Sequence, residues 1–206
     1  MSEENEIYLV KSIENLKGIK KKENNSPYHD VSTTSQENLS EKEKDEEEIS
    51  IRKNRNCKLA KSISEILDKL TLRPIKNFKK KILKDSFTGK RFPNITIYDY
   101  INRIITYTEI EENTLICSLI YIDKLDQKKQ VTKFNIHRIF FSAVLCSIKY
   151  NEDEFFNNEY YAKVAGVTIN ELNKMEYDFL VLLDFNLYIE PNTFNDYKMS
   201  LNNKID

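Results

Sequence analysis

Apolar residues recur three and four positions apart in six stretches of the chain, the first beginning at Leu59. This spacing places them along one face of a helix, so each stretch predicts a helix with a buried side. No alternation of apolar and polar residues typical of a strand extends beyond a few positions. The pattern therefore predicts an all-α protein. The expected helices cover residues 59–70, 97–108, 115–122, 134–150, 160–165 and 172–183.

The stretch from Phe134 to Tyr150 differs from the others because it is apolar around most of its circumference. In a globular protein a helix of this kind lies at the centre of a bundle. Other residues mark helix ends: Gly166 suits the left-handed position after a helix, and Thr168-Ile-Asn-Glu171 has the sequence of a capping box. Pro191 limits any extension of the last helix. We expect a five-helix bundle around residues 134–150, preceded by one amphipathic helix.

Residues 1–56 have a different composition, in which Ser, Asn, Glu and Lys dominate and a charge run extends from Glu41 to Glu48. Such a segment buries too little apolar surface to offset chain entropy, which predicts a disordered polar flank. The basic residues from Arg73 to Lys84 are consistent with a solvated linker, or with a weak patch for nucleic acid, a phosphorylated partner or nuclear import. The expected organisation is a flank at 1–56, an amphipathic helix and basic linker at 57–91, the bundle at 92–199 and a short tail at 200–206.

Charge and composition narrow the class of partner. The chain has 32 Lys and Arg residues against 33 Asp and Glu residues, and this balance argues against a nucleic-acid or membrane partner bound through bulk charge. The longest nearly apolar run, Ile139 to Ile148, is about half the roughly 20 residues that span a bilayer. Three widely spaced cysteines fit reduced thiols better than a disulfide framework. We expect an intracellular protein of the cytoplasm, the nucleus or both.

The residues that enzymes commonly use are scarce. Three glycines cannot build a phosphate-cradling loop or a dinucleotide fingerprint. Of the two histidines, His29 lies in the polar flank, and His137 has no carboxylate partner nearby in sequence, so we interpret His137 as structural. Cys146 lies in an apolar helix and is expected to behave as a small hydrophobic residue. We expect no catalytic residues, no metal, no cofactor and no small-molecule substrate.

Charged residues within the apolar helices are the most informative positions, because an unpaired buried charge is costly. Arg103 on the first bundle helix and Asp123 on the second are placed to form a bidentate pair if the helices are antiparallel. Lys149 ends the central helix, and Glu176 interrupts the apolar stripe of the last one. Periodicity alone leaves open whether Lys149 and Glu176 are solvated charges or parts of a site.

The order and surroundings of these four charges resemble a cyclin box. More narrowly, the chain is similar to the P-type (U-type) cyclins, a single-box group related to the fungal phosphate-pathway cyclins. The resemblance runs from about Leu59 to Met199. The supporting segments are Tyr100-Ile-Asn-Arg-Ile104, Tyr121-Ile-Asp-Lys124, Phe134-Asn-Ile-His-Arg138, Ala143-Val-Leu-Cys-Ser-Ile-Lys-Tyr150, Asn157-Asn-Glu-Tyr-Tyr-Ala-Lys-Val-Ala-Gly166, Leu172-Asn-Lys-Met-Glu176 and Pro191-Asn-Thr-Phe-Asn195.

The resemblance implies a non-catalytic regulatory subunit that binds and activates a cyclin-dependent serine/threonine protein kinase as a heterodimer. Lys149 and Glu176 then correspond to the pair that contacts the regulatory helix of the kinase. Arg103 and Asp123 correspond to an internal structural ion pair. An apolar rim around the kinase-binding charges has four candidates, which are equally consistent with core positions. These candidates are Tyr150, Phe155, Phe156 and Tyr177.

Two other functions stay open. One is a cyclin-fold scaffold that binds partners without activating a kinase, and the other is a transcription adaptor that uses the basic stretch. The resemblance does not extend to the substrate-docking patch of other cyclins. The corresponding segment here is Asn102-Arg-Ile-Ile-Thr-Tyr-Thr-Glu109, and the chain has no Trp.

Overall fold

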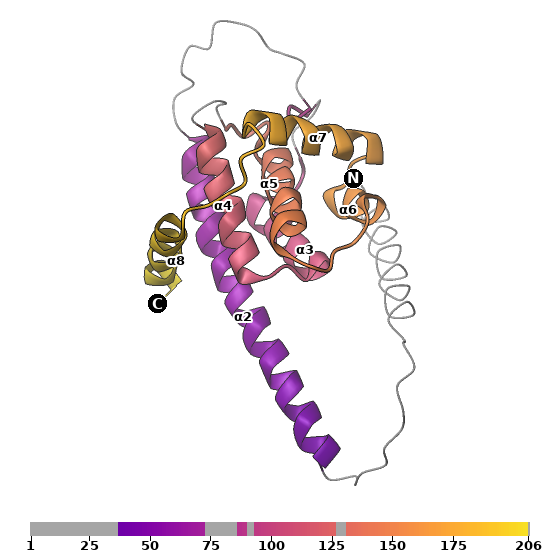
Figure 1. The fold of residues 1–206 in the computed structure, drawn as a ribbon, viewed down its shortest axis with the longest axis vertical. Helices are drawn as coiled ribbons and strands as arrows, with labels where there is room; N and C mark the ends of the chain where they lie inside the picture. The colour runs from indigo at the N-terminus through magenta and orange to yellow at the C-terminus, as the bar shows by residue number, and fades with distance from the viewer. Residues whose placement is uncertain (1–36, 73–85, 90–92, 127–130, 206) are drawn as a thin grey trace, which may run out of the picture. The chain divides into compact units, whose positions relative to one another are not determined.

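The computed structural model describes residues 37–72, 86–89, 93–126 and 131–205 (Figure 1). Every regular element in these residues is a helix, as the apolar periodicity predicts. The all-α class is therefore confirmed. The helices are α2 (Glu37–Thr71), α3 (Ile97–Thr108), α4 (Glu112–Asp126), α5 (Ile136–Asn151), α6 (Asn158–Ala165), α7 (Ile169–Leu182) and α8 (Pro191–Ile205).

The chain divides into two compact units, Met1–Lys58 and Leu59–Asp206. In the first unit the described residues belong to the N-terminal part of α2, so residues 37–56 of the predicted flank are helical. The prediction considered only the lack of apolar surface, whereas Glu and Lys, which are abundant here, have high helix propensity. Residues 1–36 and the basic stretch at 73–84 lie outside the described residues.

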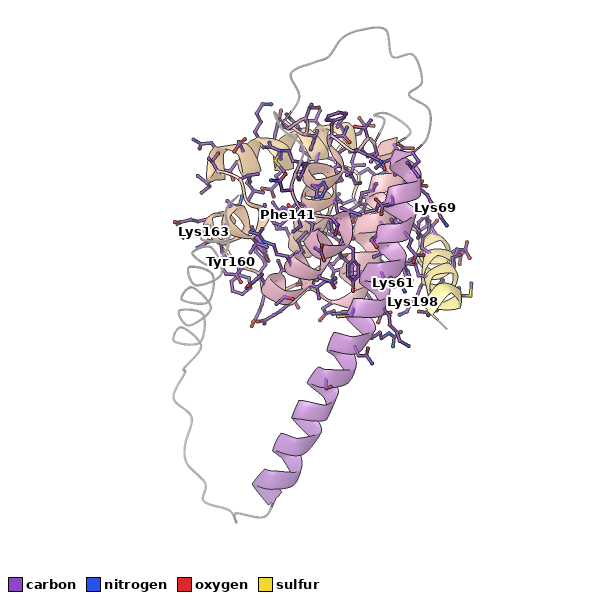
Figure 2. The ribbon with its side chains drawn as sticks, turned by 180° about the vertical axis from the view of Figure 1, so that it is seen from behind. Lys61, Lys69, Phe141, Tyr160, Lys163 and Lys198 are labelled. Carbon is purple, nitrogen blue, oxygen red and sulfur yellow. The ribbon has the colours of Figure 1, made fainter. Side chains whose placement is uncertain are left out.

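The second unit is built around α5, which contacts α3, α4, α6 and α7. Figure 1 shows α5 in the middle of these helices, and Figure 2 shows Phe141 in their interior. Every residue of α5 from Ile139 to Ile148 is buried, so this part of the helix is covered on all sides. The prediction that this helix forms the centre of the bundle is confirmed. Its fully buried members include Ile139, Phe140, Phe141, Leu145 and Ile148.

The link between α6 and α7 follows the local sequence closely. Gly166 adopts a left-handed conformation with φ of 72°, and its N–H bonds the carbonyls of the last turn of α6. Two residues later, Thr168 accepts a hydrogen bond from the Glu171 N–H, and the Glu171 carboxylate accepts one from the Thr168 N–H. The predicted capping box is therefore present, and it sets the start of α7.

Helix α8 is a feature that the sequence analysis did not predict. Pro191 is the first residue of this helix, a position where its missing N–H has no cost. The helix packs against α4 and continues to Ile205, so residues 200–205 are helical where a short tail was expected. Phe194, Tyr197 and Leu201, spaced three and four positions apart, are the signal that would have revealed it.

Candidate partner-binding surface

Lys149 and Glu176 form an ion pair across two packed helices. Lys149 lies in the last turn of α5 and Glu176 near the middle of α7, and packing of α5 on α7 brings the Lys149 Nζ to 2.6 Å from the Glu176 Oε1. The side chains are 26% and 17% exposed, respectively. Partial burial strengthens a short charge-assisted bond of this kind relative to one in bulk water.

A third helix holds the same carboxylate. The Asn158 Nδ2 at the start of α6 donates to the Glu176 Oε2 at 3.1 Å and to the Asn173 Oδ1 at 2.7 Å. Asn157, immediately before it, caps α6 by accepting a bond from the Tyr160 N–H. Asn158 lies within the segment Asn157–Gly166, and as an uncharged residue on a short helix it offers no sequence signal for this role. Both oxygens of Glu176 are thus held in place, which gives this charged group a defined orientation at the surface.

Exposed apolar side chains lie beside these charges. Tyr177, which follows Glu176, is 61% exposed, and Val181 one turn later is 43% exposed. Phe185, four positions further, is 62% exposed, and its ring lies edge-on to that of Tyr177 with centroids 6.4 Å apart. We call Tyr177, Val181 and Phe185 the α7 rim. Tyr150, which follows Lys149, is also more than half exposed.

Phe185 was missed by the sequence analysis because it follows the periodic part of α7. It has φ of 57° and follows Asp184, which has φ of 53°, so two consecutive non-glycine residues are left-handed. Bulky residues rarely adopt this conformation, which costs about 1–3 kcal/mol. The bond from the Phe185 N–H to the Leu180 carbonyl, 2.8 Å, helps to hold the turn. A strained backbone that presents an aromatic ring to solvent is typical of a functional surface.

The two remaining rim candidates differ in position. Phe155 is 47% exposed, in the connection between α5 and α6. Phe156 is half-buried: its ring stacks on Tyr160 with centroids 4.1 Å apart and lies edge-on to Tyr161. Of the two interpretations left open for Phe156, packing within the bundle agrees with this position.

Arg103 and Asp123 are not brought together. The Arg103 Nη2 donates to the Lys163 carbonyl in the last turn of α6 at 3.2 Å, and the same carbonyl also accepts a bond from the Gly166 N–H. The C-terminal end of a helix favours a cation because the helix dipole is negative there. Asp123 is exposed, and its Oδ2 accepts a bond from the Tyr197 hydroxyl of α8 at 2.8 Å. The ion pairs among the described residues do not join the two. The predicted pair is therefore corrected: Arg103 caps α6, and Asp123 anchors the unpredicted α8.

The potentially reactive groups occupy structural positions. The His137 Nε2 lies 3.0 Å from the Ile95 carbonyl, its ring lies edge-on to Tyr100, and burial lowers the pKa of His137. Burial raises the pKa of the Cys146 thiol to about 12 and that of Cys117 to about 11, so both are protonated at neutral pH. In the part of the chain that the structure describes, no group of three or more His, Cys, Asp or Glu side chains is placed to hold a metal ion.

The sequence model of the Cyclin family matches residues 9–187 of the chain. The chain belongs to the cyclin family. Its curated relatives include Cyclin-U4-3 of Arabidopsis thaliana, 39% identical over 124 residues, 59% of this chain and 57% of the relative. Cyclin-U4-2 of the same plant is 36% identical over 146 residues, 69% and 66% of the two chains. Cyclin-P3-1 of Oryza sativa subsp. japonica is 36% identical over 124 residues, which cover 58% of this chain and 52% of the relative.

These similarities confirm the predicted relation to P-type and U-type cyclins. The chain spans between half and two thirds of the length of these three relatives. Membership of the cyclin family supports a regulatory role. Among the helices that the structure describes, none is long and apolar enough to cross a membrane.

Proposed function

We propose that this protein is the non-catalytic regulatory subunit of a cyclin-dependent serine/threonine kinase, which it binds and activates as a heterodimer. The observation that carries the proposal is the Lys149–Glu176 pair, which Asn158 holds in place, together with the exposed α7 rim that begins at Tyr177, directly after Glu176. A rigid surface with paired charges and exposed aromatic groups has the composition of a protein-binding site. The cyclin relatives support a kinase as the class of partner.

The two kinds of group have different tasks in docking. The Lys149 ammonium has three N–H donors, one of which serves Glu176, so it can also donate to backbone carbonyls of a partner helix. Tyr177, Val181 and Phe185 supply apolar area that loses its water on association. The charges set the orientation of the partner, and the rim contributes most of the affinity.

Activation follows from binding one kinase conformation more tightly than another. A kinase is active when its regulatory helix is turned inward, so that the Glu of that helix pairs with the Lys that positions ATP. A surface complementary to the inward position shifts the population toward it. Moving the active state from about 1% to about 99% requires roughly 10⁴-fold tighter binding to it. The complete burial of the middle of α5 supports such discrimination, because a close-packed interior limits how far the surface above it can adapt to both positions.

The test begins with capture of partners by the tagged full-length protein from lysate of its native cells, followed by mass spectrometry. The captured kinase is then produced separately, and its phosphorylation of a peptide substrate is measured with and without this protein. Stoichiometric capture and a rise in rate that saturates with added protein support the proposal. Capture without a rise in rate would indicate a scaffold that binds without activating, and no captured kinase would remove the proposal.

A further inference from the structure

A cavity of about 440 Å³ opens between α2, α4 and α8, on residues of the second unit. The volume lies within the range of ligand pockets, roughly 300–1,000 Å³. Figures 1 and 2 show α8 beside α2 and α4 from opposite sides, and Figure 2 labels Lys69 on α2 at this position. The apolar lining comes from all three helices, through Ile66, Leu67, Leu70, Leu119, Ile122 and Leu201.

Polar residues at the cavity carry an excess of negative charge. Asp123 of α4 and Asp196 of α8 contribute two carboxylates, and Lys69 contributes one ammonium group. No ion pair among the described residues neutralises either carboxylate. The Tyr197 hydroxyl stays protonated, because burial and the adjacent Asp123 raise the pKa of Tyr197, and it donates to the Asp123 Oδ2. The cavity therefore suits an apolar group that has a cation next to it.

The dimensions of the cavity suit a short piece of polypeptide. The lining spans 66–70 on α2, 119–123 on α4 and 196–201 on α8, about one turn or slightly more of each helix. An opening of this length admits one or two side chains of a chain that passes over it. We propose that the cavity binds a short segment of a partner protein in which a Lys or Arg adjoins aliphatic residues. Its aliphatic groups enter the cavity, and its cation lies between Asp123 and Asp196.

This site is separate from the proposed kinase surface. None of the cavity residues belongs to α5, α6 or α7, which carry Lys149, Asn158 and Glu176, and none belongs to the α7 rim. The inference therefore goes beyond the proposed function and does not depend on it.

The test is direct binding, without a kinase. Fluorescein-labelled Ala-Leu-Lys-Leu-Ala amide is titrated with the purified full-length protein, and anisotropy is measured at low and high salt. Two matched peptides carry norleucine in place of Lys, or Ala in place of both Leu. We expect saturable binding of the first peptide, about fivefold weaker binding of the norleucine peptide at low salt and loss of binding for the Ala peptide. The Lys preference should shrink at high salt.

Variants locate the binding. Ser200 is exposed at the cavity, so S200W obstructs it with little risk to folding and should abolish binding. D196N should reduce the preference for Lys over norleucine, whereas D153N, an exposed carboxylate elsewhere, should leave it unchanged. Circular dichroism checks that each variant keeps its helices.

Absence of peptide binding, equal affinity for the Lys and norleucine peptides, or full binding by S200W would overturn the inference. Binding of n-hexylamine without the peptides would assign the cavity to a small amine instead. A homodimer in sedimentation that S200W dissociates would assign it to a second copy of the chain. None of these results would affect the kinase test.

Discussion

Lys149 and Glu176 are 27 positions apart in sequence, yet the Lys149 Nζ and the Glu176 Oε1 lie 2.6 Å apart because α5 and α7 pack against each other. Neither residue has an oppositely charged partner one turn away on its own helix. Periodicity could not distinguish solvated charges from parts of a site, and the contact between the two helices resolves the pairing. The α7 rim begins at Tyr177, the residue that follows Glu176.

Breaking this pair should cost stability as well as partner binding. We expect K149A and E176A each to lower the free energy of unfolding by about 1–2 kcal/mol, because each leaves a partly buried charge without its partner. A double-mutant cycle measured by urea denaturation should show favourable coupling. The control is the more exposed pair of Lys174 and Asp178, for which coupling should not exceed about 0.5 kcal/mol. Equal coupling in the two cycles would contradict a special role for Lys149 and Glu176.

Because the turn at Phe185 is strained, a substitution there should weaken kinase binding without lowering stability. Asn tolerates the left-handed region far better than Phe, so F185N should leave the thermal midpoint unchanged or raise it. Kinase capture should nevertheless fall at least tenfold, because the variant removes the aromatic end of the α7 rim. M199N, at an exposed apolar residue of α8, should keep full capture. If F185N binds as well as the wild type, the rim is not the docking surface.

The separate partners of Arg103 and Asp123 predict a specific pattern of coupling. R103A should cost about 1–2 kcal/mol through loss of the bond to the Lys163 carbonyl. A cycle that combines R103A with D123N should be additive, whereas D123N combined with Tyr197→Phe should show coupling. Chemical denaturation of the variants measures both cycles. Strong coupling between Arg103 and Asp123 would restore the pair that the sequence suggested.

His137 predicts a decline in stability at mildly acidic pH. Burial lowers its pKa in the folded state below the ordinary value of 6.5, so between these two values the unfolded chain binds more protons than the folded one. Stability should therefore fall as the pH drops below about 6.5, and the fall should end below the lowered folded-state pKa. H137Q retains an N–H donor for the Ile95 carbonyl but does not titrate, so its free energy of unfolding should change less over pH 7 to 5. If the free energies of unfolding of the wild type and of H137Q change equally with pH, His137 is excluded as the cause of the decline.

The relation between sequence and structure is closest where the signal is local. Gly166 and the Thr168–Glu171 capping box occupy the predicted helix ends, because both depend on backbone groups only a few residues away. The stretch ending at Tyr150 is central, because it is apolar around most of its circumference and every residue from Ile139 to Ile148 is buried. The order of the charged motifs was enough to suggest the cyclin family, which the match over residues 9–187 then supported.

Tertiary packing decided which residues far apart in the sequence form hydrogen bonds with each other. Asp123 bonds Tyr197 because α8, missing from the predicted set of helices, packs on α4. Arg103 bonds a backbone carbonyl, whose availability depends on where α6 ends in space. The exposure of Phe185 depends on a left-handed turn that follows the periodic stripe. Hydrophobic periodicity reports which face of each helix avoids water, whereas long-range hydrogen bonds and exposed rims depend on how those faces pack together.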